Sequence, residues 1–117
     1  MKRPKILPTL VVVASAIIIP YLIAILTQGR DNVFVGFLIN PIDGASYLAK
    51  MYQGWAGDWQ FHLPFTVNPG EGTYLFLYYL FLGHVARWLG LSLILTYHLA
   101  RLAGACALLY ALLKFYD

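Results

Sequence analysis

The sequence predicts an all-α integral membrane protein: a helical hairpin of two, or alternatively three, transmembrane helices, with one or two interfacial juxtamembrane helices in a long external loop. The chain is 61% hydrophobic and only 11% charged, whereas soluble domains carry about 25% charged residues. Long apolar runs lie near both ends, and a segment rich in turn residues and aromatics separates them. A chain of 117 residues cannot bury this much apolar surface in a soluble core, so we expect lipid to solvate part of it.

The first expected element is a transmembrane helix over residues 7–28. The uncharged apolar run of residues 6–29 is long enough, because about 20 helical residues cross the hydrocarbon core of a bilayer. It is too long for the apolar region of a signal peptide, and no small-x-small cleavage motif follows it. Basic residues before a span favour a cytoplasmic N-terminus, and three precede this run: Lys2, Arg3 and Lys5.

The next segment, residues 29–71, is expected to be an external loop that lies on the bilayer surface. It holds more acidic than basic side chains, which favours the outer side. Residues 44–56 are predicted to form a short helix with Asp43 as its N-cap. Trp55 and Trp59 suit the membrane interface, where amphipathic rings are favoured.

Residues 72–90 allow two interpretations. The segment is apolar and aromatic until His84, Arg87 and Trp88, and its uncharged part is short for a crossing. It therefore forms either a juxtamembrane helix in the interface or an additional span. Arg87 as a cytoplasmic residue favours the span, and Lys114 slightly favours the interfacial helix.

The last apolar segment, residues 92–116, is predicted to be the final transmembrane helix. Arg101 interrupts it, and we expect His98 and Arg101 near one interface, where an arginine can reach the headgroups. The sequence predicts neither a metal site nor a cofactor, because Cys106 is the single cysteine and no paired-cysteine motif exists. A nucleic-acid partner is also excluded, because aromatic residues do not interleave with a basic patch.

The candidate site residues fall into two groups. Asp43 is either a helix cap, worth about 1 kcal/mol, or a catalytic carboxylate, and the two roles are compatible. His84 and Arg87 lie three residues apart, as do His98 and Arg101, so each pair shares a helical face. The predicted lipid or interface residues are Trp55, Trp59, His84, Arg87, Trp88, His98 and Arg101.

The sequence resembles the N-terminal module of the GT-C superfamily, multi-spanning glycosyltransferases that use polyprenyl-phosphate sugars. The resemblance covers roughly residues 5–116, and its motifs are short. They are Asp43-Gly-Ala-Ser-Tyr-Leu-Ala-Lys50, Gly54-Trp-Ala-Gly-Asp58-Trp59, Phe65-Thr66, the aromatic segment Tyr74 to Gly90, and His98-Leu-Ala-Arg101-Leu. The resemblance implies that residues 72–90 form a juxtamembrane helix, which leaves two spans. It also implies that Asp43 matches the loop carboxylate that orients or deprotonates the acceptor.

Three functional hypotheses follow. The first is a small non-catalytic membrane subunit, an accessory component of a larger membrane complex in a bacterial or archaeal cytoplasmic membrane, since the sequence lacks the family's second acidic loop and lipid-phosphate surface. The alternative is the N-terminal part of a glycosyltransferase with Asp43 as its acceptor-activating carboxylate. The third is a lipid- or pigment-binding scaffold built from the aromatic loop and helix. The expected partners are the bilayer and other membrane subunits.

Overall fold

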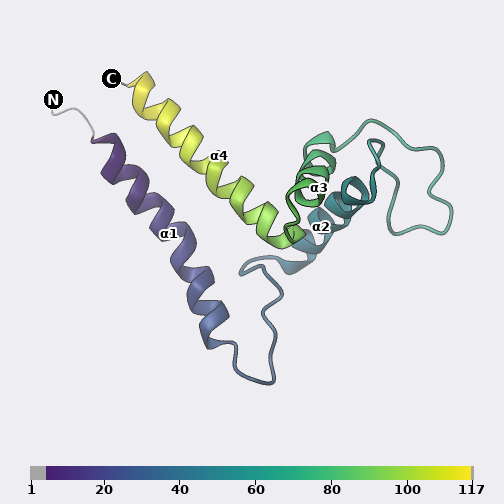
Figure 1. The fold of residues 1–117 in the computed structure, drawn as a ribbon, viewed down its shortest axis with the longest axis horizontal. Helices are drawn as coiled ribbons and strands as arrows, with labels where there is room; N and C mark the ends of the chain where they lie inside the picture. The colour runs from purple at the N-terminus through teal and green to yellow at the C-terminus, as the bar shows by residue number, and fades with distance from the viewer. Residues whose placement is uncertain (1–4, 117) are drawn as a thin grey trace. The chain divides into compact units, whose positions relative to one another are not determined.

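The computed structural model describes residues 5–116, which fold into four α-helices (Figure 1). These are α1 (Ile6–Thr27), α2 (Pro41–Ala56), α3 (Leu77–Leu89) and α4 (Leu93–Phe115). The predicted all-helical class is confirmed: residues 5–116 contain no strand, only an isolated antiparallel bridge between Phe61 and Thr73. The basic residues Lys2 and Arg3, on which the predicted orientation depends, lie outside the described residues.

The chain divides into two compact units. The first contains α1, the segment that follows it up to Leu38, and α4 from Leu99 onward. The second, Ile39–His98, contains α2, α3, the loop between them and the first residues of α4. The candidate site residues from Asp43 to His98 therefore all belong to the second unit, and Arg101 belongs to the first.

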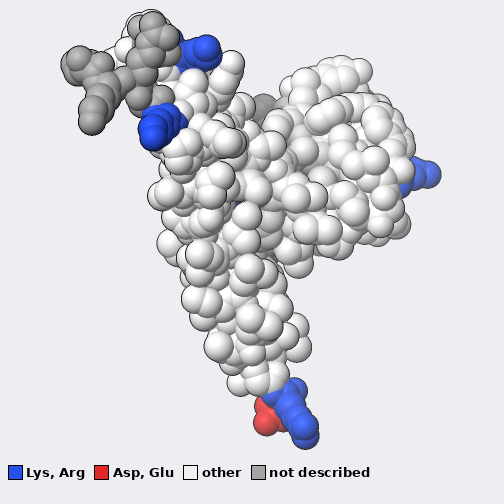
Figure 2. All heavy atoms as spheres, turned by 60° about the vertical axis from the view of Figure 1, so that its left-hand side comes forward, with Lys and Arg blue, Asp and Glu red and all other residues white. Residues whose placement is uncertain are grey.

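Two helices are long and apolar enough to cross a membrane. Helix α1 has 22 residues and α4 has 23, so at about 1.5 Å per residue each exceeds the roughly 30 Å of a hydrocarbon core. No described side chain of α1 is buried, and in α4 only Thr96 is. On the face drawn in Figure 2, charged side chains appear at the upper end, the lower tip and the right edge, and the broad surface between them is uncharged. These features are consistent with a membrane protein.

Helix α3 is too short to be a third span. Its 13 residues extend about 20 Å, so the three-span alternative for residues 72–90 is not supported. Residues 72–76 lie outside the helix because Thr73 pairs with Phe61 and because Phe76, with a φ of 55°, occupies the N-cap. Gly90 ends the helix in the left-handed conformation, with a φ of 66°, which glycine adopts without steric cost.

Helices α2 and α3 pack together through two glycines. A Cβ on Gly54 would lie 2.0 Å from the carbonyl oxygen of Leu80, and a Cβ on Gly83 would lie 1.9 Å from that of Met51. The two backbones are therefore in direct contact at this crossing. Beside it, the side chains of Met51 and Leu80 are fully buried, and each contributes about 1.5–3 kcal/mol of apolar burial.

Candidate functional site

Asp43 lies in the first turn of α2 and its side chain is exposed. The prediction that it caps the helix is wrong: Asn40 is the N-cap residue and Pro41 begins the helix. Proline is favoured at this first position, because its fixed φ suits the helix and its missing N–H has no partner to lose. The side-chain amide of Asn40 instead donates a hydrogen bond to Oδ2 of Asp43. The Asn40-Pro41 pair was the sequence signal for this start.

Asp43 is placed where its carboxylate can accept a proton from another molecule. A carboxylate near a helix N-terminus is favoured by the helix dipole, and Asn40 fixes its orientation from one side. Its exposure leaves room for an incoming hydroxyl. A carboxylate in this setting can act as a general base if the acceptor is held within hydrogen-bonding distance.

Lys50 lies two helical turns beyond Asp43 and is enclosed by aromatic rings. Its Nζ is 4.2 Å from the ring centre of Phe76, 5.4 Å from that of Tyr47 and 5.6 Å from that of Tyr79. Each ring attracts the ammonium through its quadrupole. Since the spacing of Asp43, Tyr47 and Lys50 is i, i+4, i+7, the carboxylate and the ammonium belong to one face of α2.

A stack of three tyrosines joins α2, α3 and the start of α4. The ring of Tyr47 lies 5.1 Å from that of Tyr79 and 5.9 Å from that of Tyr97, with interplanar angles of 5° and 12°. Burial raises the pKa of Tyr79 above 10.0, and the nearby phenols of Tyr47, Tyr97 and Tyr78 raise it further. No sequence pattern predicts this cluster, because its members come from three helices and no periodicity within one helix links them.

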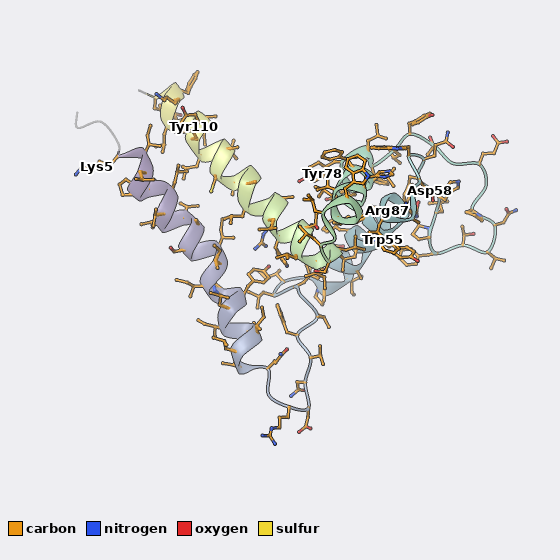
Figure 3. The ribbon with its side chains drawn as sticks, viewed as in Figure 1. Lys5, Trp55, Asp58, Tyr78, Arg87 and Tyr110 are labelled. Carbon is orange, nitrogen blue, oxygen red and sulfur yellow. The ribbon has the colours of Figure 1, made fainter. Side chains whose placement is uncertain are left out.

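His84 and Arg87 contact backbone carbonyls that lie at the end of α2 and just beyond it. The Nε2 atom of His84 lies 3.1 Å from the carbonyl oxygen of Asp58, and since a carbonyl only accepts, Nε2 carries the proton. Nη1 of Arg87 donates to the carbonyl oxygen of Trp55 at 3.4 Å. A cation is favourable at this helix C-terminus. Figure 3 shows Trp55, Asp58 and Arg87 in one part of the α2–α3 pair.

Trp59 and Trp88 lie beside the ring of His84. The ring of His84, which is 6% exposed, stacks on Trp59 at a centroid distance of 4.0 Å and lies 5.9 Å from Trp88. Trp55, Trp59 and Trp88 keep large exposed surfaces. Of the predicted interface residues in this unit, the tryptophans are therefore open to their surroundings, whereas the His84 ring lies inside the helix pair.

The loop between α2 and α3 is closed at its base. The side-chain amide of Gln53 donates to the carbonyl oxygen of His62 at 2.8 Å and accepts from its N–H at 2.9 Å. Phe61 and Thr73 exchange two backbone hydrogen bonds, of 2.8 and 3.1 Å. These four bonds hold residues 62–72 as a defined loop, from which Phe65 and Val67 project with their side chains exposed.

His98 and Arg101 are not brought together as one site. The ring of His98 packs edge-on against Tyr97 at 5.3 Å. Arg101 belongs to the first unit, where its Nη1 donates to the hydroxyl of Tyr21 at 2.8 Å and its guanidinium carbon lies 4.6 Å from the centre of that ring. Arg101 thus links α4 to α1.

The described residues show no candidate metal centre. Within residues 5–116, no group of three or more His, Cys, Asp or Glu side chains is placed to hold a metal ion. Cys106 is a free thiol. In comparisons with known proteins, no family model, curated protein or solved structure matches this chain.

Proposed function

We propose that this chain forms the acceptor-side membrane module of a glycosyltransferase that uses a polyprenyl-phosphate sugar, with Asp43 as the carboxylate that activates the acceptor. The observation that carries the proposal is the position of Asp43, exposed in the first turn of the first short helix after a long apolar helix. The order of elements supports it: two short helices lie between two helices that could each cross the bilayer. This is the arrangement that the resemblance to the GT-C superfamily implies.

The proposed step is a nucleophilic displacement at the anomeric carbon of the sugar. The acceptor hydroxyl gives its proton to the Asp43 carboxylate while its oxygen forms a bond to the anomeric carbon. The bond between that carbon and the lipid phosphate breaks, and the phosphate leaves with the electron pair. Developing charge on the phosphate needs cationic or hydrogen-bonding groups, which other elements of the enzyme supply.

Replacing Asp43 with asparagine tests this role. The Asp43→Asn side chain keeps the size of aspartate and can still accept the hydrogen bond from Asn40, but it cannot take a proton. We expect transfer from a polyprenyl-phosphate sugar to fall by about 10²–10⁴-fold in membrane vesicles from cells expressing the protein. The control is Glu71→Gln, which removes an exposed loop carboxylate. Full activity in Asp43→Asn would remove Asp43 from the mechanism.

A non-catalytic accessory subunit is the second candidate, and a different observation favours it. A Cβ built on Gly104 of α4 meets no atom within 4 Å, and α1 has no buried residue, so both helices offer free surface to other membrane helices. Small residues allow such helices to approach closely. The same vesicle assay separates the candidates: an accessory subunit predicts that transfer is unchanged in Asp43→Asn, whereas the catalytic role predicts its loss.

A further inference from the structure

Helix α3 has an unusual distribution of polarity. A helix on the surface of a soluble protein turns apolar residues inward and polar residues outward. In α3 the ring of His84 is buried against Trp59, and Arg87, although exposed, reaches back to the carbonyl oxygen of Trp55 on α2. Its other exposed side chains are all large and apolar or aromatic: Leu77, Tyr78, Phe81, Trp88 and Leu89.

These residues form one continuous stripe. At 100° per residue, positions 77, 78, 81, 88 and 89 fall within about one third of the helix circumference. The residues that meet α2, among them Leu80 and Gly83, lie outside this stripe. We call the stripe made by Leu77, Tyr78, Phe81, Trp88 and Leu89 the outer face of α3.

Helix α2 has no comparable stripe of large apolar side chains along its exposed side. Its exposed side carries the small residues Ala45 and Ala56 together with the larger Ile42, Tyr52 and Trp55. The charged side chains Asp43 and Lys50 are on α2, and Asp58 follows its C-terminal end. The pair therefore has a continuous apolar face on α3, whereas the exposed side of α2 mixes apolar, small and charged side chains.

We propose that the outer face of α3 lies in the boundary between headgroups and acyl chains of the bilayer, with α2 on the side toward water. The bilayer, rather than a protein, is the occupant that fits. Tyr78 and Trp88 are the ring types favoured at this depth. Only Gly90, Leu91 and Ser92 separate α3 from α4, a helix long enough to cross the membrane, so a membrane-inserted α4 keeps α3 at the bilayer.

This inference rests on the membrane insertion in the proposed function but not on glycosyl transfer. It also goes further, because it fixes which helix of the pair is deeper. With α2 toward water, the exposed Asp43 remains accessible to an acceptor from the aqueous side.

Fluorescence quenching of single tryptophans tests the depth of the two helices. One variant keeps only Trp88 (Trp55→Phe, Trp59→Phe), and its matched control keeps only Trp55 (Trp59→Phe, Trp88→Phe). Both are reconstituted in phosphatidylcholine vesicles with or without brominated acyl chains. We expect brominated lipid to quench Trp88 at least twofold more than Trp55, and aqueous iodide to quench Trp55 more than Trp88.

A second measurement avoids the tryptophans. Tyr78 on α3 and Tyr52 on α2 are equally exposed, at 56% and 57%. Each is replaced by cysteine in a Cys106→Ala background and carries a nitroxide. We expect oxygen to relax the label at position 78 more, and a water-soluble nickel chelate to relax the label at position 52 more.

The outcomes separate the inference from the proposed function. Equal or stronger lipid quenching of Trp55, or a reversed nitroxide pattern, overturns the placement of α3 while leaving insertion and transfer intact. Protein that fails to float with the vesicles overturns membrane insertion and with it the inference. Loss of transfer in Asp43→Asn is measured independently of either result.

Discussion

Among residues 5–116, two residues other than glycine adopt left-handed backbone conformations, and each stands at the N-cap of a short helix. Asn40, with a φ of 50°, precedes α2, and Phe76, with a φ of 55°, precedes α3. Such a conformation costs of order 1–3 kcal/mol away from glycine, and asparagine tolerates it better than phenylalanine. The ring of Phe76 packs edge-on against Phe61 at 4.9 Å and lies 4.2 Å from the ammonium of Lys50. These contacts offset the cost of the left-handed backbone and place the Phe76 ring among the aromatic rings around Lys50.

The raised pKa of Tyr79 predicts a specific dependence on alkaline pH. A pKa raised above 10.0 means that the fold favours the neutral phenol. The resulting stability is fully present below pH 10 and is lost as the pH rises through the folded-state pKa. We therefore expect Tyr79→Phe to retain more stability above pH 10 than the wild type, measured by thermal unfolding in detergent from pH 8 to 11.5.

The control for Tyr79→Phe is Tyr110→Phe on α4. Tyr110 is exposed and lies outside the tyrosine stack, so this variant reports the effect of losing any one phenol. An identical alkaline decline in wild type and Tyr79→Phe would show that the tyrosine stack does not couple folding to pH.

At the scale of elements, the second unit depends on the crossing of α2 and α3. Four features hold it together: the contact of Gly54 and Gly83, the buried Met51 and Leu80, the tyrosine stack, and the hydrogen bonds from α3 to the end of α2. Each requires the helices to have one particular rotation about their axes. The glycine crossing sets the distance between the backbones, and the other contacts follow from it.

Gly83→Ala tests the crossing. Its Cβ would meet the backbone oxygen of Met51 at 1.9 Å, and a backbone atom cannot move aside as a flexible side chain does. We expect a loss of about 1–3 kcal/mol or more in the free energy of unfolding, as for overpacked cores, measured by circular dichroism in detergent.

Gly104→Ala is the matched control, because it also places alanine for glycine inside a helix. A Cβ at Gly104 meets nothing within 4 Å, and alanine is the better helix former by about 0.5–1 kcal/mol. We expect unchanged or slightly raised stability. Similar losses in both variants would contradict the close crossing.

At the scale of the whole molecule, the two long apolar helices among residues 5–116 lie on either side of a larger polar and aromatic segment. If both helices cross the bilayer, an even number of crossings returns the chain to its starting side. Lys5 before α1 and Lys114 at the end of α4 then share the cytoplasmic side, as the positive-inside rule favours. Under the same condition, residues 29–71 lie on the opposite side of the bilayer.

Cysteine labelling tests this topology. Single cysteines replace Lys5, Asn68 or Lys114 in a Cys106→Ala background. We expect an impermeant maleimide to label position 68 in intact spheroplasts, and to label positions 5 and 114 only after permeabilisation. Labelling of position 114 from outside would indicate an odd number of crossings.

Local features of this fold could be predicted from the sequence. The apolar runs that became α1 and α4, and the aromatic segment between them, are properties of contiguous residues. The helix over residues 44–56 was expected, but its start was misplaced, because the Asn40-Pro41 signal competes with Asp43 for the cap. The short length of α3 depended on the pairing of Thr73 with Phe61 across the loop, which no local pattern reveals.

The sequence by itself determined that the chain is helical, that two of its helices are long and apolar, and that a short helix ending near residue 56 lies between them. The tertiary structure alone decided which residues are in contact: the glycines at the α2–α3 crossing, the rings around Lys50, and the contacts of His84 and Arg87 with carbonyls at the end of α2. The physical reason is that composition and periodicity act within one helix, whereas these contacts depend on the rotation of one helix against another. Close backbone packing, possible only where both helices carry glycine, fixes that rotation.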